Sequence, residues 1–213
     1  FLVSSLLAGQ VVDPDAGALQ GIVVIAADTT NGSWEYSMDG STWSALAAPS
    51  ITSGLLLAAD AQTRLRFVPA ANFNGTVTSG LTLRAWDRTS GTAGGRLDTT
   101  ATGRTAAFSS SSFGVDVAVS EVNDSPTAAP VDLGTRAEDG GAFTFDASQL
   151  LANASDLENH ALSVSNVVAS AGVVVDNGDG TWTWTPVANW NGTVSFSYDI
   201  TDNGTTAGAA DPR

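Results

Sequence analysis

The chain contains no cysteine and no lysine, and His160 is the single histidine among its 213 residues. Without cysteine, neither disulfide bonds nor thiolate metal sites can hold the fold, and one histidine cannot supply a zinc cluster. The same shortages leave no candidate for a catalytic triad or a lysine Schiff base. We therefore expect oxygen ligands at any metal site, and no enzymatic activity.

Basic residues are scarce: the chain has eight arginines and 22 acidic residues, which give a formal net charge of -14. Nucleic acids and anionic membrane surfaces are recognised by cationic proteins, so the sequence argues against both partners. No apolar run approaches the ~20 residues that a membrane-spanning helix needs. We expect neither nucleic-acid binding nor membrane insertion.

Sustained helical periodicity is absent too, whereas alternation of apolar and polar residues between turn residues is frequent, which is typical of strands. The strands predicted in this way are 23–26, 33–37, 65–68, 81–86, 113–119, 142–145, 162–168, 172–175, 181–185 and 194–200. Short strands with Asn-Gly and Asp-Gly turns predict an all-β fold of two tandem Greek-key β-sandwiches.

An internal repeat divides the chain. The segment Phe67–Val77 returns as Trp184–Val194, with its proline, its asparagines and its Asn-Gly-Thr-Val turn in the same order. The proline-containing segment 122–130 separates the copies, which predicts domains at 1–124 and 125–213. The chain begins and ends abruptly, so we expect the first domain to lack its first strand and the second to lack its last.

The first domain also carries an insert between its repeated segments. This insert contains an Asp39-Gly40 turn, Trp43 and the apolar run Leu55–Ala59. Two interpretations remain open: a plain additional hairpin, or a ligand-binding feature.

Acidic residues recur at matching places in both halves. Each half has a pair of acidic residues two positions apart in a loop and an aspartate at the end of the strand that follows the repeated turn, and the linker adds further oxygen ligands. The candidate metal ligands are Asp13, Asp15, Asp87, Glu121, Asn123, Asp124, Glu138, Asp156, Glu158 and Asp202. Ca²⁺ takes six to eight oxygens from such loops, so Ca²⁺ is the expected cofactor.

A simpler interpretation competes with metal binding, because an aspartate in a turn commonly caps its own backbone. The repetition in both halves favours the metal.

His160, beside the acidic loop, is predicted to be solvated. The tryptophans Trp34, Trp86, Trp182, Trp184 and Trp190 suit core packing better than a sugar-stacking surface.

Taken together, these motifs resemble the cadherin-like repeats of giant bacterial RTX adhesins. The residues that carry the resemblance are Val122-Asn-Asp-Ser-Pro126, Glu138-Asp139, Leu150-Leu-Ala152, Asp156-Leu-Glu158 and Asn189-Trp-Asn-Gly-Thr193. The resemblance implies cadherin/Ig-like β-sandwiches that are stiffened by Ca²⁺ at the domain junction, with Glu138 serving the opposite end. Glu158 departs from the family pattern, which has aspartate there.

The resemblance also implies a function and a location. It points to an extracellular, type I secreted adhesin at the bacterial cell surface, which supports cell adhesion and biofilm formation. The partners would be neighbouring domains of the same long chain and a host-cell or surface ligand. Two roles follow: a structural extender made rigid by Ca²⁺, which explains more of the sequence, or a module that binds a sugar or peptide through Trp43 and neighbouring loops.

Overall fold

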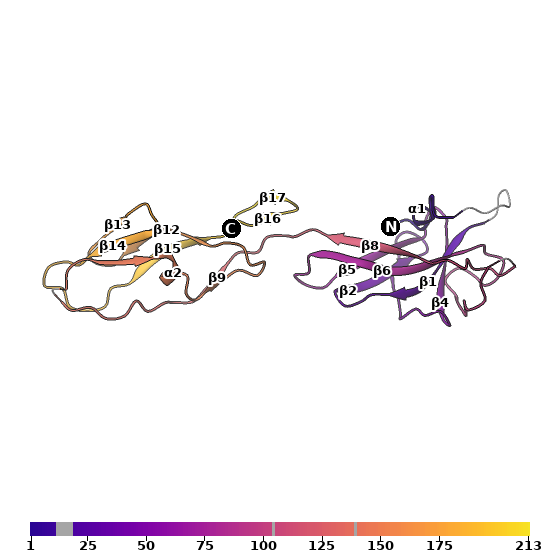
Figure 1. The fold of residues 1–213 in the computed structure, drawn as a ribbon, viewed down its shortest axis with the longest axis horizontal. Coiled ribbons are helices and arrows are strands. Elements are labelled where there is room, and N and C mark those ends of the chain that lie inside the picture. Colours follow the sequence, from indigo (N-terminus) through magenta and orange to yellow (C-terminus); the bar gives the residue numbers. More distant parts are fainter. Residues whose placement is uncertain (12–18, 104, 139) are drawn as a thin grey trace. The chain divides into compact units, whose positions relative to one another are not determined.

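The computed structural model describes residues 1–11, 19–103, 105–138 and 140–213, which form two compact units, Phe1–Val119 (unit 1) and Ser120–Arg213 (unit 2). Both units are built almost entirely of antiparallel strands, which confirms the predicted all-β class (Figure 1). The helices α1 (Val3–Leu7) and α2 (Ala147–Leu150) are short. Within the described residues no helix is long and apolar enough to cross a membrane.

Unit 1 contains two sheets. The larger has the order β7 (Arg96–Leu97), β4 (Gly54–Ala58), β1 (Gly21–Ala27), β6 (Gly75–Trp86) and β8 (Phe113–Val119). The smaller has the order β3 (Ser44–Ala45), β2 (Gly32–Ser37) and β5 (Arg64–Pro69). Apolar side chains from both sheets, among them Ile22, Trp34 and Leu65, share one core cluster, as the alternating pattern predicts.

The insert of unit 1 adds a core strand. All five residues of β4 are buried, and the strand pairs with β1 from Gly21↔Ala58 to Val24↔Leu55. Trp43 is covered by the Arg66 guanidinium, which lies 4.1 Å from the centre of its ring. Glu35 holds that guanidinium through a 2.7 Å hydrogen bond from Arg66 Nε. The hairpin interpretation of the insert fits β2 and β3, which pair on either side of the Asp39-Gly40 turn, but the apolar run forms a strand inside the larger sheet. The structure therefore gives the insert a structural role.

Unit 2 contains smaller sheets. One has the order β10 (Phe143–Asp146), β14 (Thr181–Thr185) and β13 (Val173–Asp176). The others pair β12 (Ser163–Ala169) with β15 (Phe196–Thr201), β9 (Thr127–Ala128) with β11 (Ala154–Ser155), and β16 (Thr205–Thr206) with β17 (Ala209–Ala210). Phe145, Leu150 and Trp182 form the buried core. The helix α2 begins with a capping box between Asp146 and Gln149, which fixes how the chain leaves β10.

The repeated motif forms the same turn in both units. Asn72 and Asn189 have φ values of 63° and 58°, in the left-handed region that asparagine tolerates better than most residues. The backbone N–H of Phe73 donates to Ala70, and that of Trp190 donates to Val187, at 3.2 and 3.1 Å. Turn chemistry therefore explains why these asparagines recur.

Candidate metal centre

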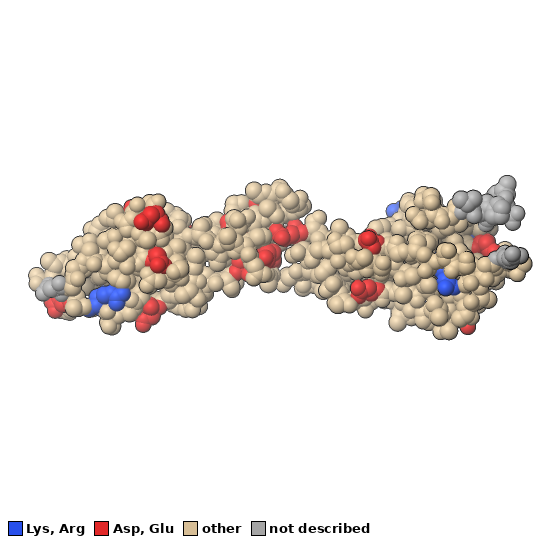
Figure 2. Space-filling view, in the orientation of Figure 1, with Lys and Arg blue, Asp and Glu red and all other residues tan. Residues whose placement is uncertain are grey.

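The candidate metal centre lies in unit 2 and is assembled from three segments. These are the extended segment at the start of the unit, the loop between β11 and β12, and the chain that follows β15. The side chains concerned are Glu121, Asn123, Asp156, Glu158, His160 and Asp202. Figure 2 shows acidic side chains gathering on the visible face beside the β16–β17 hairpin.

The loop is organised around Asp156. Its Oδ1 accepts the backbone N–H groups of Glu158 and His160 at 3.1 and 2.8 Å. Asn159 turns the chain between them with a φ of 64°. Because Oδ1 is committed to the loop, only Oδ2 of this carboxylate remains free to bind something else, and Oδ2 is buried without a hydrogen-bond partner.

Asn123 is held in an equally definite orientation. Its side-chain amide donates to Asp202 Oδ1 and to the carbonyl of Asp211, both at 2.8 Å, and its backbone N–H donates to Thr206 Oγ1 at 3.0 Å. The residue is 2% exposed. With both amide protons used, the side-chain oxygen points away from these partners and has no donor.

Asp202 is buried at 3% exposure at the end of β15. Burial alone raises the pKa of its carboxyl, but hydrogen bonds from Gly204 N–H, Asn123 Nδ2 and Arg213 N–H outweigh that effect and hold the pKa below its usual range. Asp202 is therefore ionised at neutral pH, and it adds negative charge where the free oxygens of Asn123 and Asp156 lie.

Three buried polar atoms in this region have no hydrogen-bond partner: Asn123 Oδ1, Asp156 Oδ2 and His160 Nδ1. A Cβ added at Gly204 would overlap Asn123 Oδ1 and lie 2.6 Å from His160 Nδ1, so both atoms pack against this glycine. The ligand atoms of Asp156, Glu158 and His160 lie within 4.8 Å of one another. Leaving buried polar atoms unpaired is costly, so these three atoms mark the candidate site.

The remaining predicted ligands differ in their surroundings. Glu121 accepts a hydrogen bond from Thr205 Oγ1 at 3.1 Å. The Asp124 side chain is exposed, while its backbone N–H donates to Glu158 Oε2 at 3.1 Å. Glu138 is exposed and takes no part in the cluster of Asp156, Glu158 and His160.

In unit 1, the Asp87 carboxylate caps its own turn through the N–H and hydroxyl of Thr89. Asp13 and Asp15 lie outside the described residues. The repeated acidic positions of unit 1 therefore stay a prediction.

The prediction that His160 is solvated is wrong. Its side chain is 18% exposed, with Nε2 3.1 Å from Glu121 Oε1 and Nδ1 buried. A solitary histidine in an acidic loop gave little reason to expect this, because its burial depends on Glu121 and Gly204, which are distant in the sequence.

The burial of Trp34, Trp86 and Trp182 at 1–4% exposure confirms their predicted core positions.

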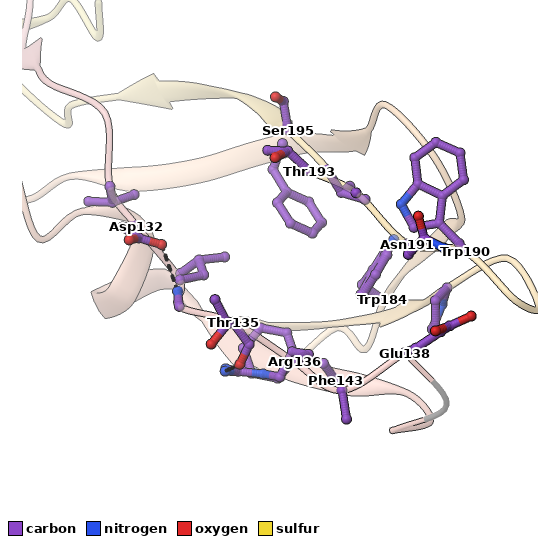
Figure 3. A pocket seen from close by; sticks show the side chains of 18 of the residues that line it. Asp132, Thr135, Arg136, Glu138, Phe143, Trp184, Trp190, Asn191, Thr193 and Ser195 are labelled. Carbon is purple, nitrogen blue, oxygen red and sulfur yellow. Dashed lines mark hydrogen bonds between the residues drawn. The ribbon is translucent and has the colours of Figure 1, made fainter.

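A second concave feature of unit 2 is an aromatic groove of about 850 Å³. Its lining includes Asp132, Arg136, Phe143, Trp184, Trp190 and Phe196. Figure 3 shows Trp184 and Trp190 on one side and Arg136 with Phe143 on the other, with Glu138 at the rim. The Trp190 ring is 38% exposed, so its predicted core position is wrong.

The donor atoms of the first site fit a divalent cation. Asp156 and Glu158 supply carboxylate oxygens and Asn123 an amide oxygen, which are the ligands that Ca²⁺ takes in proteins. The Asp202 carboxylate lies outside the cluster of Asp156, Glu158 and His160 and is occupied by hydrogen bonds from Asn123, Gly204 and Arg213. Asn123 and Asp156 are nearly fully buried, with a free oxygen each. Solvated acidic turns satisfy all their polar atoms, so the free oxygens distinguish this cluster from the capped turn at Asp87.

Of the comparisons with known proteins, one found a match. No curated protein and no solved structure matches the chain. The family of cadherin-like domains matches residues 122–211, and this match supports unit 2 as a cadherin-like module. The matched residues contain every member of the candidate metal centre apart from Glu121.

Proposed function

We propose that this chain is a Ca²⁺-binding structural module of an extracellular bacterial adhesin. The observation that carries the proposal is the buried, unpartnered oxygens of Asn123 and Asp156, which lie in a negatively charged cluster of a cadherin-like module. Oxygen ligands, negative charge and a loop that holds them are what a Ca²⁺ site requires. A role in cell adhesion and biofilm formation at the bacterial surface follows from the sequence resemblance.

The cation would act on the segment that connects the two units. Glu121 and Asn123 lie in the first residues of unit 2, immediately after unit 1 ends at Val119, and Asp156 and Asp202 lie further along the same unit. Hydrogen bonds from Asn123 to Thr206, Asp202 and Asp211 already attach this segment to the rest of unit 2, and a cation bound by both sets would hold it more firmly. The free length of chain between the units would then be shorter, which would stiffen the junction.

Calorimetric titration with Ca²⁺, combined with melting curves, tests this function. A ligand that binds only the folded state stabilises it by about 2.7 kcal/mol at a hundredfold excess over the dissociation constant. We expect Ca²⁺ to raise the melting temperature of the chain and Asp156→Asn to remove most of the rise. Asp176→Asn, at an exposed aspartate of the same unit, serves as the matched control. A melting curve indifferent to both Ca²⁺ and chelator would contradict the proposal.

A second candidate function is the binding of a sugar or peptide, and the aromatic groove favours it. The exposed Trp190 and the adjacent Trp184 offer flat apolar faces beside the polar side chains of Asn191 and Thr193 (Figure 3). Tryptophan fluorescence with glycan and peptide panels tests this role. Trp190→Ala should abolish a binding signal that Trp43→Ala leaves intact, whereas a signal lost only with Trp43→Ala would place the site at the insert.

A further inference from the structure

We infer that His160 is a nitrogen ligand of the cation site and gives it affinity for a first-row transition-metal dication such as Zn²⁺. The inference rests on the proposed function, because it concerns the same site. It goes beyond that function because Ca²⁺ takes oxygen ligands, whereas imidazole nitrogen suits Zn²⁺ and its neighbours. The inference departs from the expectation, made from the sequence, that oxygen atoms alone hold any metal, because a single histidine can take part in a mixed nitrogen and oxygen site.

The first step of the argument is the orientation of the imidazole. Nδ1 of His160 is buried and makes no hydrogen bond. It packs against Gly204, as Asn123 Oδ1 does, and lies 3.4 Å from Asp156 Oδ1 without forming a hydrogen bond. A nitrogen lone pair repels oxygen acceptors that lie this close when no proton donor stands between them. A cation bound by these atoms would replace the repulsion by attraction.

The second step concerns the other ring nitrogen. Nε2 of His160 lies 3.1 Å from Oε1 of Glu121. Asp156 Oδ1 lies further from Nδ1, at 3.4 Å, and forms no hydrogen bond with it. The closer carboxylate therefore favours the proton on Nε2 in the neutral ring, which leaves the lone pair on Nδ1. Metal-bound histidines commonly have this arrangement, in which a carboxylate behind the ring fixes its tautomer and orientation. Glu121 is therefore a positioning residue, which acts through His160.

The third step concerns the neighbouring ligands. The ligand atoms of Asp156, Glu158 and His160 all lie within 4.8 Å of one another. The Asp156 side chain is 1% exposed and its Oδ2 is free. One imidazole nitrogen with two carboxylates and an amide oxygen is a donor set that Zn²⁺ accepts. His160 thus adds selectivity to a site that the oxygens alone would leave to Ca²⁺.

The experiment compares Zn²⁺ and Ca²⁺ binding to the whole chain by calorimetry. We expect His160→Ala to weaken Zn²⁺ binding at least 100-fold and to change Ca²⁺ binding much less. His160→Asp, which replaces nitrogen by oxygen, should lower the affinity for Zn²⁺ and raise that for Ca²⁺. Glu121→Gln should lower the Zn²⁺ affinity by about 10- to 100-fold, as expected for a residue that positions a ligand.

Nuclear magnetic resonance gives a readout that a purely structural role would not change. Because the chain has one histidine and no cysteine, a single set of imidazole signals reports the site. We expect Zn²⁺ to shift the Nδ1 resonance of His160 strongly, and Ca²⁺ to leave it nearly unchanged. Ca²⁺ binding with no Zn²⁺-induced shift would overturn this inference and leave the proposed function standing. Binding of neither ion would overturn both.

Discussion

At the scale of single residues, Gly204 shows how closely the candidate metal centre is packed. Any larger residue would place a Cβ within 2.6 Å of His160 Nδ1 and still closer to Asn123 Oδ1. We expect Gly204→Ala to abolish cation-induced stabilisation and to destabilise unit 2, because Asn123 would lose its hydrogen bond to Asp202. Calorimetry would show the loss, and the transition of unit 1 in the same scan is the internal control. A variant that kept the full cation response would contradict this packing.

Asp39 makes a residue-scale prediction about pH. The hydroxyl of Thr42, followed by the backbone N–H groups of Thr42 and Ser41, holds the pKa of Asp39 well below its usual range. A carboxylate with a lowered pKa contributes stability above about pH 4, its pKa in the unfolded chain, and loses it as the pH falls.

The melting temperature of unit 1 should therefore fall as the solution is acidified below about pH 4, and Asp39→Asn should weaken this dependence. Melting curves between about pH 6 and pH 2 check the prediction. Parallel pH profiles of the two proteins would count against it.

At the scale of elements, the repeated Pro-x-Ala-Asn turn is where local chemistry matters most. Asn189 has a φ of 58° and leads into the segment that lines the aromatic groove. Asn189→Ala should destabilise unit 2 by about 1 kcal/mol, because the left-handed backbone conformation costs more free energy for alanine than for asparagine. Asn189→Gly should cost less, since glycine adopts this conformation freely. Denaturant unfolding measures both, and equal losses would show that the side chain of Asn189 matters more than its φ.

At the scale of the whole molecule, the proposed function predicts that cations act on the segment at which the two units join. We expect Ca²⁺ to narrow the distribution of interdomain distances measured by small-angle scattering, and chelator to broaden it. Asp156→Asn should resemble the chelated protein, whereas the control Asp176→Asn should not. An unchanged distribution would contradict the stiffening role while leaving Ca²⁺ binding intact.

The sequence by itself determined the fold class, most strands and the recurring turn. The strands predicted at 113–119 and 181–185 have the bounds of β8 and β14, because period-two alternation between turn residues is a local signal. The turns at Asn72 and Asn189 were equally predictable, since a short stretch of chain contains all of their chemistry.

Only the tertiary structure decided the site. Asn123 and Asp202 meet in a buried hydrogen bond although they are 79 positions apart, and Glu121 reaches His160 from a different segment. It also decided that β4 lies inside a sheet and that Trp190 borders a groove. Such contacts depend on which segments pack together, and packing determines whether a polar side chain meets water, a hydrogen-bond donor or neither. The free nitrogen of His160 is therefore a property of the fold, which no local pattern of residues contains.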